Sequence, residues 1–237
     1  MPPSKILVLG GTGPAGICLL RELLYRHHSV VAYARNPSKI PSDLASNPLL
    51  TTIQGSTSDA PALSSAMHGC TTVLSHLGAQ ITDSHISPSL YVDMYRGAIV
   101  PAMRDNGIKR IFLMGTMAIT KPEDSFTLMT PLILAYMKLL ARPVLHNLLG
   151  IADFFEKQAA DLDWTVFRIA SIPGESDEES WRKGREEGEL YAGPVGSKGW
   201  TMNTNRSALA RWLVDGVEGG KEEWVRKMPA VTRLGGR

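Results

Sequence analysis

The sequence has little of what several classes of protein require. Its 237 residues include only two cysteines, Cys18 and Cys70, which are too few for a disulfide framework. Neither cysteine has a second cysteine or a histidine at the spacing of a metal site, so we expect no metal. Because unpaired cysteines are typical of reducing compartments, we expect a cytoplasmic protein.

Excess charge and long apolar runs are also missing. The 25 Lys and Arg face 23 Asp and Glu, a formal net charge of +2. So small an excess argues against the basic field that drives nucleic-acid binding. An uncharged apolar run at residues 126–137 is interrupted by Pro131 and followed by Lys138, and it falls short of the ~20 residues that span a bilayer. We therefore expect a soluble protein that binds neither nucleic acid nor membrane.

What the sequence does contain is typical of one large globular domain with a real core. Apolar residues make up 43% and charged residues 20%, which is ordinary for such a protein. Short apolar runs alternate with longer amphipathic ones, so the chain is predicted to form an α/β, Rossmann-type doubly wound parallel sheet. Strands are predicted at residues 6–9, 30–34, 49–54, 71–77, 110–114, 164–167 and 226–231, and helices from about 14 and at 60–68, 88–105, 145–160 and 206–217.

Two segments depart from this alternation. Residues 116–147 form an apolar insertion, which either packs on the sheet or forms a wall for a lipophilic substrate. Residues 175–189 carry ten charged residues in fifteen, as expected of a solvated loop or helix, or of a mobile flap over the ligand site. With the C-terminal segments, the insertion is expected to form a small lobe beside the sheet.

A glycine-rich loop follows the first predicted strand. The sequence GGTGPAG at residues 10–16 places Gly10, Gly13 and Gly16 three residues apart. Such a loop allows a tight turn and lets a pyrophosphate approach the backbone, while the following helix offers its free N–H groups. Pro14 suits the first helical turn, where no N–H is needed. A purely structural turn is the alternative, but a strand before the loop and an amphipathic helix after it indicate dinucleotide binding.

The end of the second predicted strand bears on which dinucleotide is bound. Folds that bind NAD normally place Asp or Glu there to accept hydrogen bonds from the ribose hydroxyls. In this sequence Arg35 occupies that position, followed by Asn36 and Lys39. A guanidinium binds a 2′-phosphate in a bidentate manner and offers no acceptor to a ribose diol. We therefore expect NADP rather than NAD; the alternative is an exposed arginine without a ligand.

The sequence around the loop resembles a known family. Residues 10–40 read GGTGPAGICLLRELLYRHHSVVAYARNPSKI. They are similar to the NmrA-like, NAD(P)H-binding branch of the atypical short-chain dehydrogenases/reductases, with its GATGxxG loop and its V-x-A-x-x-R-N-P strand end. The resemblance continues at residues 55–59, 68–78, 106–111 and 162–168, and so accounts for nearly the whole chain.

This resemblance implies a single NAD(P)-binding domain over residues 1–237 and a set of cofactor-binding residues. Ser56 stands where the family usually has Asp. The resemblance places Arg35 at the 2′-phosphate, Ser56 and Thr57 at the adenine, Leu77 and Gly78 at the nicotinamide-side ribose, and six loop residues at the pyrophosphate: Gly10, Thr12, Gly13, Pro14, Ala15 and Gly16.

The usual proton donor of short-chain dehydrogenases is missing. Those enzymes use Tyr-x-x-x-Lys, in which the lysine lowers the pKa of the tyrosine one helical turn away. None of the six tyrosines here has lysine four residues further on. Three other residues are candidates for the proton donor: Thr116 just after the fifth predicted strand, His146 on a predicted helix, and Tyr136 in the insertion. The plainer interpretation of Thr116 is a hydroxyl that hydrogen-bonds within a turn, and that of His146 is a histidine that hydrogen-bonds to backbone or water.

These features predict an NADP(H)-dependent oxidoreductase that acts on a lipophilic small molecule, with natural-product tailoring as its setting. Two alternatives stay open. One is a non-redox isomerase, dehydratase or cyclase on the same fold. The other is an NADP-sensing regulatory protein.

Overall fold

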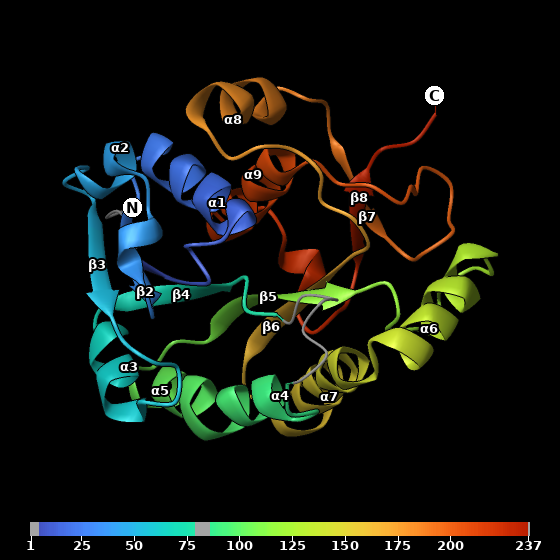
Figure 1. Ribbon diagram of the computed structural model, residues 1–237, viewed down its shortest axis with the longest axis horizontal. Helices are drawn as coiled ribbons and strands as arrows, with labels where there is room; N and C mark the ends of the chain where they lie inside the picture. Colours follow the sequence, from blue (N-terminus) through green and yellow to red (C-terminus); the bar gives the residue numbers. More distant parts are fainter. Residues whose placement is uncertain (1–4, 79–85, 237) are drawn as a thin grey trace.

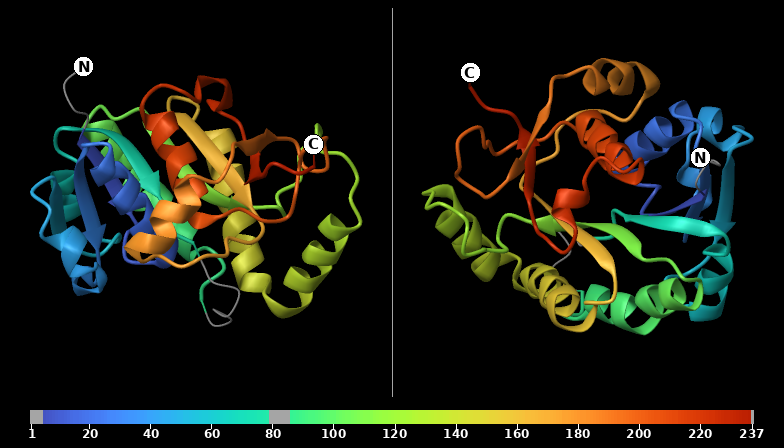
Figure 2. Two further views of the ribbon diagram at one scale, coloured as in Figure 1. Left: turned by 90° about the horizontal axis from the view of Figure 1, so that it is seen from above. Right: turned by 180° about the vertical axis from the view of Figure 1, so that it is seen from behind.

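The computed structural model describes residues 5–78 and 86–236, and a mostly parallel sheet runs through this part of the chain (Figures 1 and 2). Its strand order is β3-β2-β1-β4-β5-β6-β8-β7, and only the β7–β8 pair is antiparallel. The predicted Rossmann-type doubly wound fold is confirmed. The strands are β1 Lys5–Leu9, β2 Ser29–Ala34, β3 Leu50–Gln54, β4 Cys70–Ser75, β5 Arg110–Thr116, β6 Asp163–Ile169, β7 Leu190–Gly193 and β8 Ala230–Arg233.

Helices cover both faces of the sheet, which is why the central strands are apolar on both sides. In β1, Leu7 lies between Val31 of β2 and Val73 of β4 and is fully buried. One face packs against α1, α8 and α9, and the other against α3, α5 and α7 (Figure 1). The helices are α1 Pro14–Tyr25, α2 Ser42–Ala45, α3 Ala60–Ala66, α4 Leu90–Met94, the π-helix η2 Tyr95–Ile99, α5 Val100–Asp105, α6 Met129–Leu140, α7 Arg142–Gln158, α8 Glu178–Arg185 and α9 Arg206–Val217, with 3₁₀ turns η1 Pro37–Lys39 and η3 Glu222–Trp224.

The apolar segment after β5 forms two helices that meet at a sharp bend. α6 occupies its centre, and α7 begins at Arg142, before the expected end of the insertion at residue 147. No single helix in the described residues is long and apolar enough to cross a membrane. α6 and α7 pass that test only as a pair, and their axes are bent by 120°.

The charged segment at residues 175–189 contains a packed helix. Asp177 caps α8 by accepting a hydrogen bond from the N–H of Ser180 at 2.9 Å. Trp181 is buried against α1 and α9, and Arg185 donates to the buried carboxylate of Glu22 on α1 at 2.9 Å. The segment is therefore docked on the helical layer and is not a free flap.

Two strands near the C-terminus differ from the prediction. The strand predicted at residues 226–231 begins only at Ala230, and β7 was not predicted.

A buried ion pair connects the loop after β5 to strand β6. Arg168 of β6 has no exposed surface, and its guanidinium binds both carboxylate oxygens of Asp124 at 2.6 and 2.8 Å. Asp124 also accepts from the N–H of Val195 at 2.8 Å. Burial opposes the charged carboxylate, but Arg168 and the backbone N–H groups outweigh it and hold the pKa of Asp124 below its usual value.

We predict that Asp124→Asn lowers the free energy of unfolding by about 3–5 kcal/mol, because it leaves the Arg168 charge buried without a counter-ion. Asp161→Asn is the matched control, since it breaks the half-exposed pair with Arg104 and should cost less than ~1 kcal/mol. Because the pKa of Asp124 is depressed by folding, its contribution is present above the unfolded-state pKa and is lost as the pH falls through the folded-state pKa. Urea unfolding of both variants at neutral and acidic pH measures this; equal losses at neutral pH would contradict it.

Candidate cofactor-binding site

The turn from β1 into α1 is built on close backbone contacts. Gly10 has a φ of +78°, and a Cβ there would lie 2.9 Å from the carbonyl of His76, which follows β4. A Cβ on Gly16 would lie 2.2 Å from the carbonyl oxygen of Gly10. Both positions therefore require glycine for the fold itself.

Gly13 is different, because the fold does not require glycine there. Its φ of −84° is ordinary, and the nearest atom to an added Cβ is the carbonyl oxygen of Gly10 at 3.7 Å. Gly13 is the N-cap of α1, no side chain caps that helix, and Pro14 follows at its start. The first-turn N–H groups thus face the carboxyl edge of the sheet without a side-chain acceptor, an arrangement suited to phosphate.

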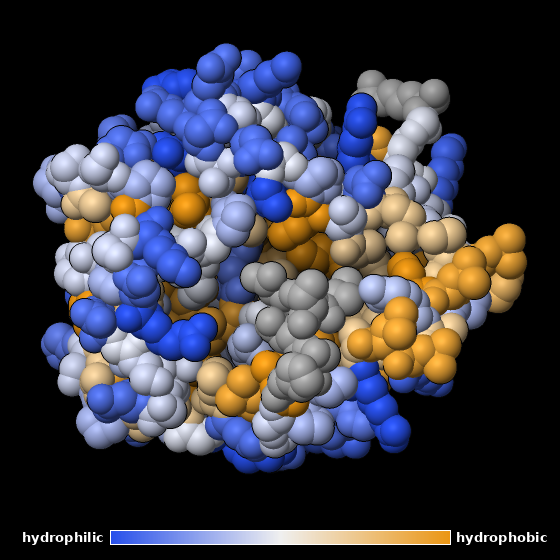
Figure 3. Space-filling model, in the orientation of Figure 1, coloured by the Kyte–Doolittle hydropathy of each residue, from blue (hydrophilic) through white to orange (hydrophobic). Residues whose placement is uncertain are grey.

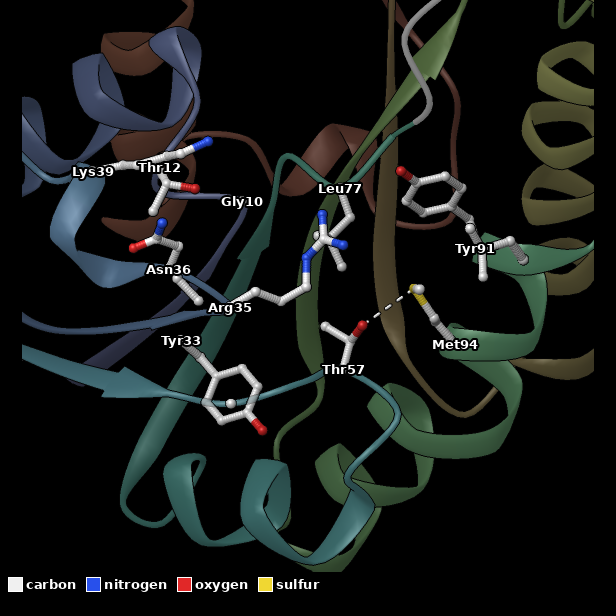
Figure 4. A pocket seen from close by; sticks show the side chains of 13 residues that line it. Gly10, Thr12, Tyr33, Arg35, Asn36, Lys39, Thr57, Leu77, Tyr91 and Met94 are labelled. Carbon is white, nitrogen blue, oxygen red and sulfur yellow. Dashed lines mark hydrogen bonds between the residues drawn. The ribbon is translucent and has the colours of Figure 1, made fainter. Parts of the chain in front are cut away.

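Beside this turn lies a cavity of about 330 Å³ (Figure 4), within the size range of small-molecule sites. Seven of the thirteen expected cofactor residues line it, namely Gly10, Thr12, Arg35, Asn36, Lys39, Thr57 and Leu77. The other six do not line it: Gly13, Ser56 and Gly78 lie in the adjoining loops, and Pro14, Ala15 and Gly16 lie in the first turn of α1. The other lining residues are Tyr33, Ala34, Gly55, Leu90, Tyr91 and Met94.

The end of β2 contributes the positive charge of the cavity. Arg35 is exposed and reaches across the cavity toward Leu77, whereas Asn36 and Lys39 lie on the other side (Figure 4). No residue in the described part of the chain makes a hydrogen bond or an ion pair with the Arg35 guanidinium. None of the described residues that line the cavity is acidic. Among the residues that the structure describes, the cavity thus offers an unpaired guanidinium and no carboxylate.

The floor of the cavity is fixed by Tyr33 and the turn after β3. The Tyr33 hydroxyl donates to the carbonyl of Ser56 at 3.0 Å, and a Cβ on Gly55 would lie 2.1 Å from that hydroxyl oxygen. The Ser56 hydroxyl is bonded to Ser58 at 2.7 Å. Thr57, by contrast, lines the cavity and donates to the Met94 sulfur at 3.2 Å (Figure 4).

A buried asparagine holds the far wall in place. Asn147 of α7 is 1% exposed, its side-chain oxygen accepts from the N–H of Tyr91 at 2.8 Å, and its amide donates to the carbonyl of Ser87 at 2.7 Å. These bonds fix the start of α4, which carries Leu90, Tyr91 and Met94 into the cavity wall. Sequence reasoning missed this role, because nothing in the sequence pairs residue 147 with residue 91.

His76 is a second residue that the sequence did not single out. It follows β4 beside Gly10, and its ring lies 5.7 Å from the ring of Phe167. Both ring nitrogens are buried and form no hydrogen bond within the described residues. Burial lowers the pKa of His76 to about 4, so the imidazole is neutral at physiological pH.

The structure does not bring the three candidate catalytic residues together. Thr116 ends β5 at the carboxyl edge of the sheet, and its hydroxyl oxygen accepts from the N–H of Ala118 at 3.3 Å. His146 is exposed on α7, Tyr136 is 47% exposed on α6, and neither lines the cavity. The described residues contain no group of three or more His, Cys, Asp or Glu that could hold a metal ion.

The fold and the glycine turn define a nucleotide-binding Rossmann protein, and comparison with known proteins specifies the family. A profile of NAD(P)H-binding proteins matches residues 10–218. The chain therefore belongs to the NAD(P)H-binding family, and the resemblance seen in the sequence is confirmed. A search of curated proteins found no match.

Solved structures share the fold at low sequence identity. A short-chain dehydrogenase/reductase from Veillonella parvula DSM 2008 in complex with NADP is 18% identical, with a TM-score of 0.73 over 98% of this chain and 95% of that chain. The anaerobillin reductase ChuY from Escherichia coli O157:H7 is 12% identical, with a TM-score of 0.66 over 99% of each chain. A Rossmann-fold NAD(P)-binding protein from Shigella flexneri is 19% identical, with a TM-score of 0.63 over 99% of this chain and 97% of that one.

We predict that Gly13→Val abolishes dinucleotide binding but leaves the fold intact, because the side chain fits the empty turn and blocks the approach of a phosphate. Gly188→Val is the matched control, since Gly188 is exposed with no atom within 4 Å of an added Cβ. Circular dichroism checks folding, and calorimetric titration with NADPH checks binding. A folded Gly13→Val variant that binds NADPH as the unchanged protein does would show that the loop is only a turn.

Proposed function

We propose that the protein is an NADP(H)-dependent oxidoreductase that acts on a lipophilic small molecule. The observation that carries the proposal is the Arg35 guanidinium, which has no partner among the described residues and lies in a cavity whose described lining has no carboxylate. Among the described lining residues a ribose diol would find no charged acceptor, whereas a 2′-phosphate would find the Arg35 guanidinium. The cavity therefore favours NADP over NAD.

Different residues of the turn and the cavity would bind different parts of the cofactor. The uncapped start of α1 would bind the pyrophosphate through backbone N–H groups, with Gly13 allowing close approach. Thr57 and Met94 would contact the adenine, and Leu77 the ribose on the nicotinamide side. When bound, the nicotinamide would supply or accept a hydride, and the chain would hold it in place.

A lipophilic substrate is supported by the residues beyond the carboxyl edge of β5. Ala118, at the start of the insertion, packs with Met137, Leu145 and Leu148 of α6 and α7 in a separate apolar cluster. Thr116 lies two residues before Ala118, and no described residue accepts its hydroxyl proton. A substrate carbonyl beside this cluster would therefore meet Thr116 as a hydrogen-bond donor. Natural-product tailoring is a setting that suits such a substrate.

Because the sequence has no Tyr-x-x-x-Lys pair, two other functions remain as alternatives. Without that acid, the same fold suits a non-redox isomerase, dehydratase or cyclase, or an NADP-sensing regulator. Incubation with NADPH and a hydrophobic quinone such as menadione separates the reductase from the sensor. Oxidation of NADPH supports a reductase, whereas tight binding of the cofactor without turnover of any carbonyl compound favours the sensor.

Cofactor preference is the first test. We expect NADPH to bind about 10- to 100-fold more tightly than NADH, because a charge-assisted hydrogen-bonded pair contributes ~1.5–3 kcal/mol. Arg35→Ala should remove most of that difference, and Arg182→Ala, which truncates an exposed arginine on α8, should not. Dissociation constants for both cofactors measure this. Equal affinities in the unchanged protein would contradict the proposal, and a preference that survives Arg35→Ala would assign the phosphate to Asn36 or Lys39.

Proton delivery is the second test. If Thr116 hydrogen-bonds to the substrate oxygen and passes on a proton taken up from solvent, Thr116→Val should lower turnover by about 10²- to 10⁴-fold while NADPH affinity stays unchanged. His146→Ala and Tyr136→Phe should retain near-full turnover, because both side chains are exposed outside the cavity. Steady-state rates with the quinone check the three variants. Full activity of Thr116→Val would leave proton delivery to solvent, and a large loss in either other variant would transfer the role to that residue.

A further inference from the structure

α6 is apolar around its whole circumference, and yet it is hardly buried. Of its twelve residues only Met137 is buried. Six large side chains on α6 and the segment before it are between 47% and 82% exposed: Phe126, Leu128, Leu132, Tyr136, Leu139 and Leu140. We call these six residues the α6 surface. Figure 3 shows apolar side chains gathered where α6 projects from the body of the protein.

Such a surface is unusual on a protein that is alone in water. A helix that is hydrophobic all round is normally enclosed by protein or lipid, and large contiguous apolar patches mark interaction sites. The α6 surface also lies outside the cofactor cavity, since none of its residues lines that cavity. It therefore needs an occupant that cofactor binding does not explain.

The charges around the surface indicate what that occupant is. Residues 125–152 contain no Asp or Glu, but they include Lys138 and Arg142. Both cations are exposed, and neither forms a hydrogen bond or an ion pair with any residue in the described ranges. The surface thus combines apolar and aromatic side chains with two unpaired positive charges beside them, a combination that suits a membrane interface rich in anionic headgroups.

We propose that the α6 surface docks on an anionic lipid membrane, with α6 lying in the plane of the interface. At ~1.5 Å per residue a twelve-residue helix is about 18 Å long, too short to span a bilayer of ~30 Å. The leucines and Phe126 enter the acyl boundary, Tyr136 lies at headgroup depth, and Lys138 and Arg142 contact lipid phosphates. The sequence-based expectation of no membrane partner considered spanning segments alone.

A second copy of the chain fits this surface less well. A two-fold contact would place each α6 surface against itself. Lys138 and Arg142 would then lie on both sides of the contact, and no acidic residue between 125 and 152 is present to compensate them. Like charges across an interface oppose association, whereas an anionic lipid surface complements them.

Sedimentation of the full chain with phosphatidylcholine vesicles, with and without phosphatidylserine, tests the proposal. The protein should bind the serine-containing vesicles more tightly. Leu132→Ser with Leu139→Ser should weaken that binding about tenfold or more. Lys138→Gln with Arg142→Gln should weaken it about 30-fold on anionic vesicles only, since each basic residue contributes separately to attraction by the anionic surface.

Leu234→Ser and Arg182→Gln serve as matched controls, because both residues are exposed and lie outside the α6 surface. They should leave vesicle binding unchanged, and all variants should bind NADPH normally, which verifies folding. Failure of the unchanged protein to sediment with anionic vesicles would overturn the proposal, as would binding that the four substitutions on and beside α6 do not weaken. A lipid-free dimer that dissociates in Leu132→Ser with Leu139→Ser would assign the surface to a second copy instead.

Discussion

The contact between Gly16 and the carbonyl of Gly10 is the constraint from which the rest of the site follows. It brings the first turn of α1 against the end of β1 with no room for a side chain. α1 is thereby held with its start at the carboxyl edge of the sheet, beside the ends of β2 and β4. A parallel sheet collects loop residues from several strands at that edge. The cavity lies there for this reason.

The two ends of the site differ in the charge and in the burial of their polar groups. At the end of β2 the groups are exposed and basic, and no ion pair involves Arg35 within the described residues. At the end of β4 the polar groups are buried: His76 is held neutral by its surroundings, and the Ser75 hydroxyl is bonded to Tyr95 at 2.6 Å. An anionic ligand group is thus favoured at one end and a neutral one at the other.

The sequence predicted those parts that depend on local pattern. The bounds of α9 and the β1–α1 turn follow from periodicity and glycine spacing, and both were predicted well. Parts that depend on distant contacts were not: β7 is a short antiparallel edge strand, and Asn147 positions α4 from 56 residues away. α6 escaped prediction for a third reason, because its apolar residues follow no single face.

A crystal structure of the NADP complex tests the central claim most directly. The account predicts pyrophosphate oxygens within hydrogen-bond distance of the N–H groups at the start of α1, and the 2′-phosphate against the Arg35 guanidinium. Gly13 should lie in van der Waals contact with the pyrophosphate, in the space that the fold itself leaves open. A dinucleotide bound away from this turn, or one whose 2′-phosphate faces solvent with Arg35 turned aside, would contradict it.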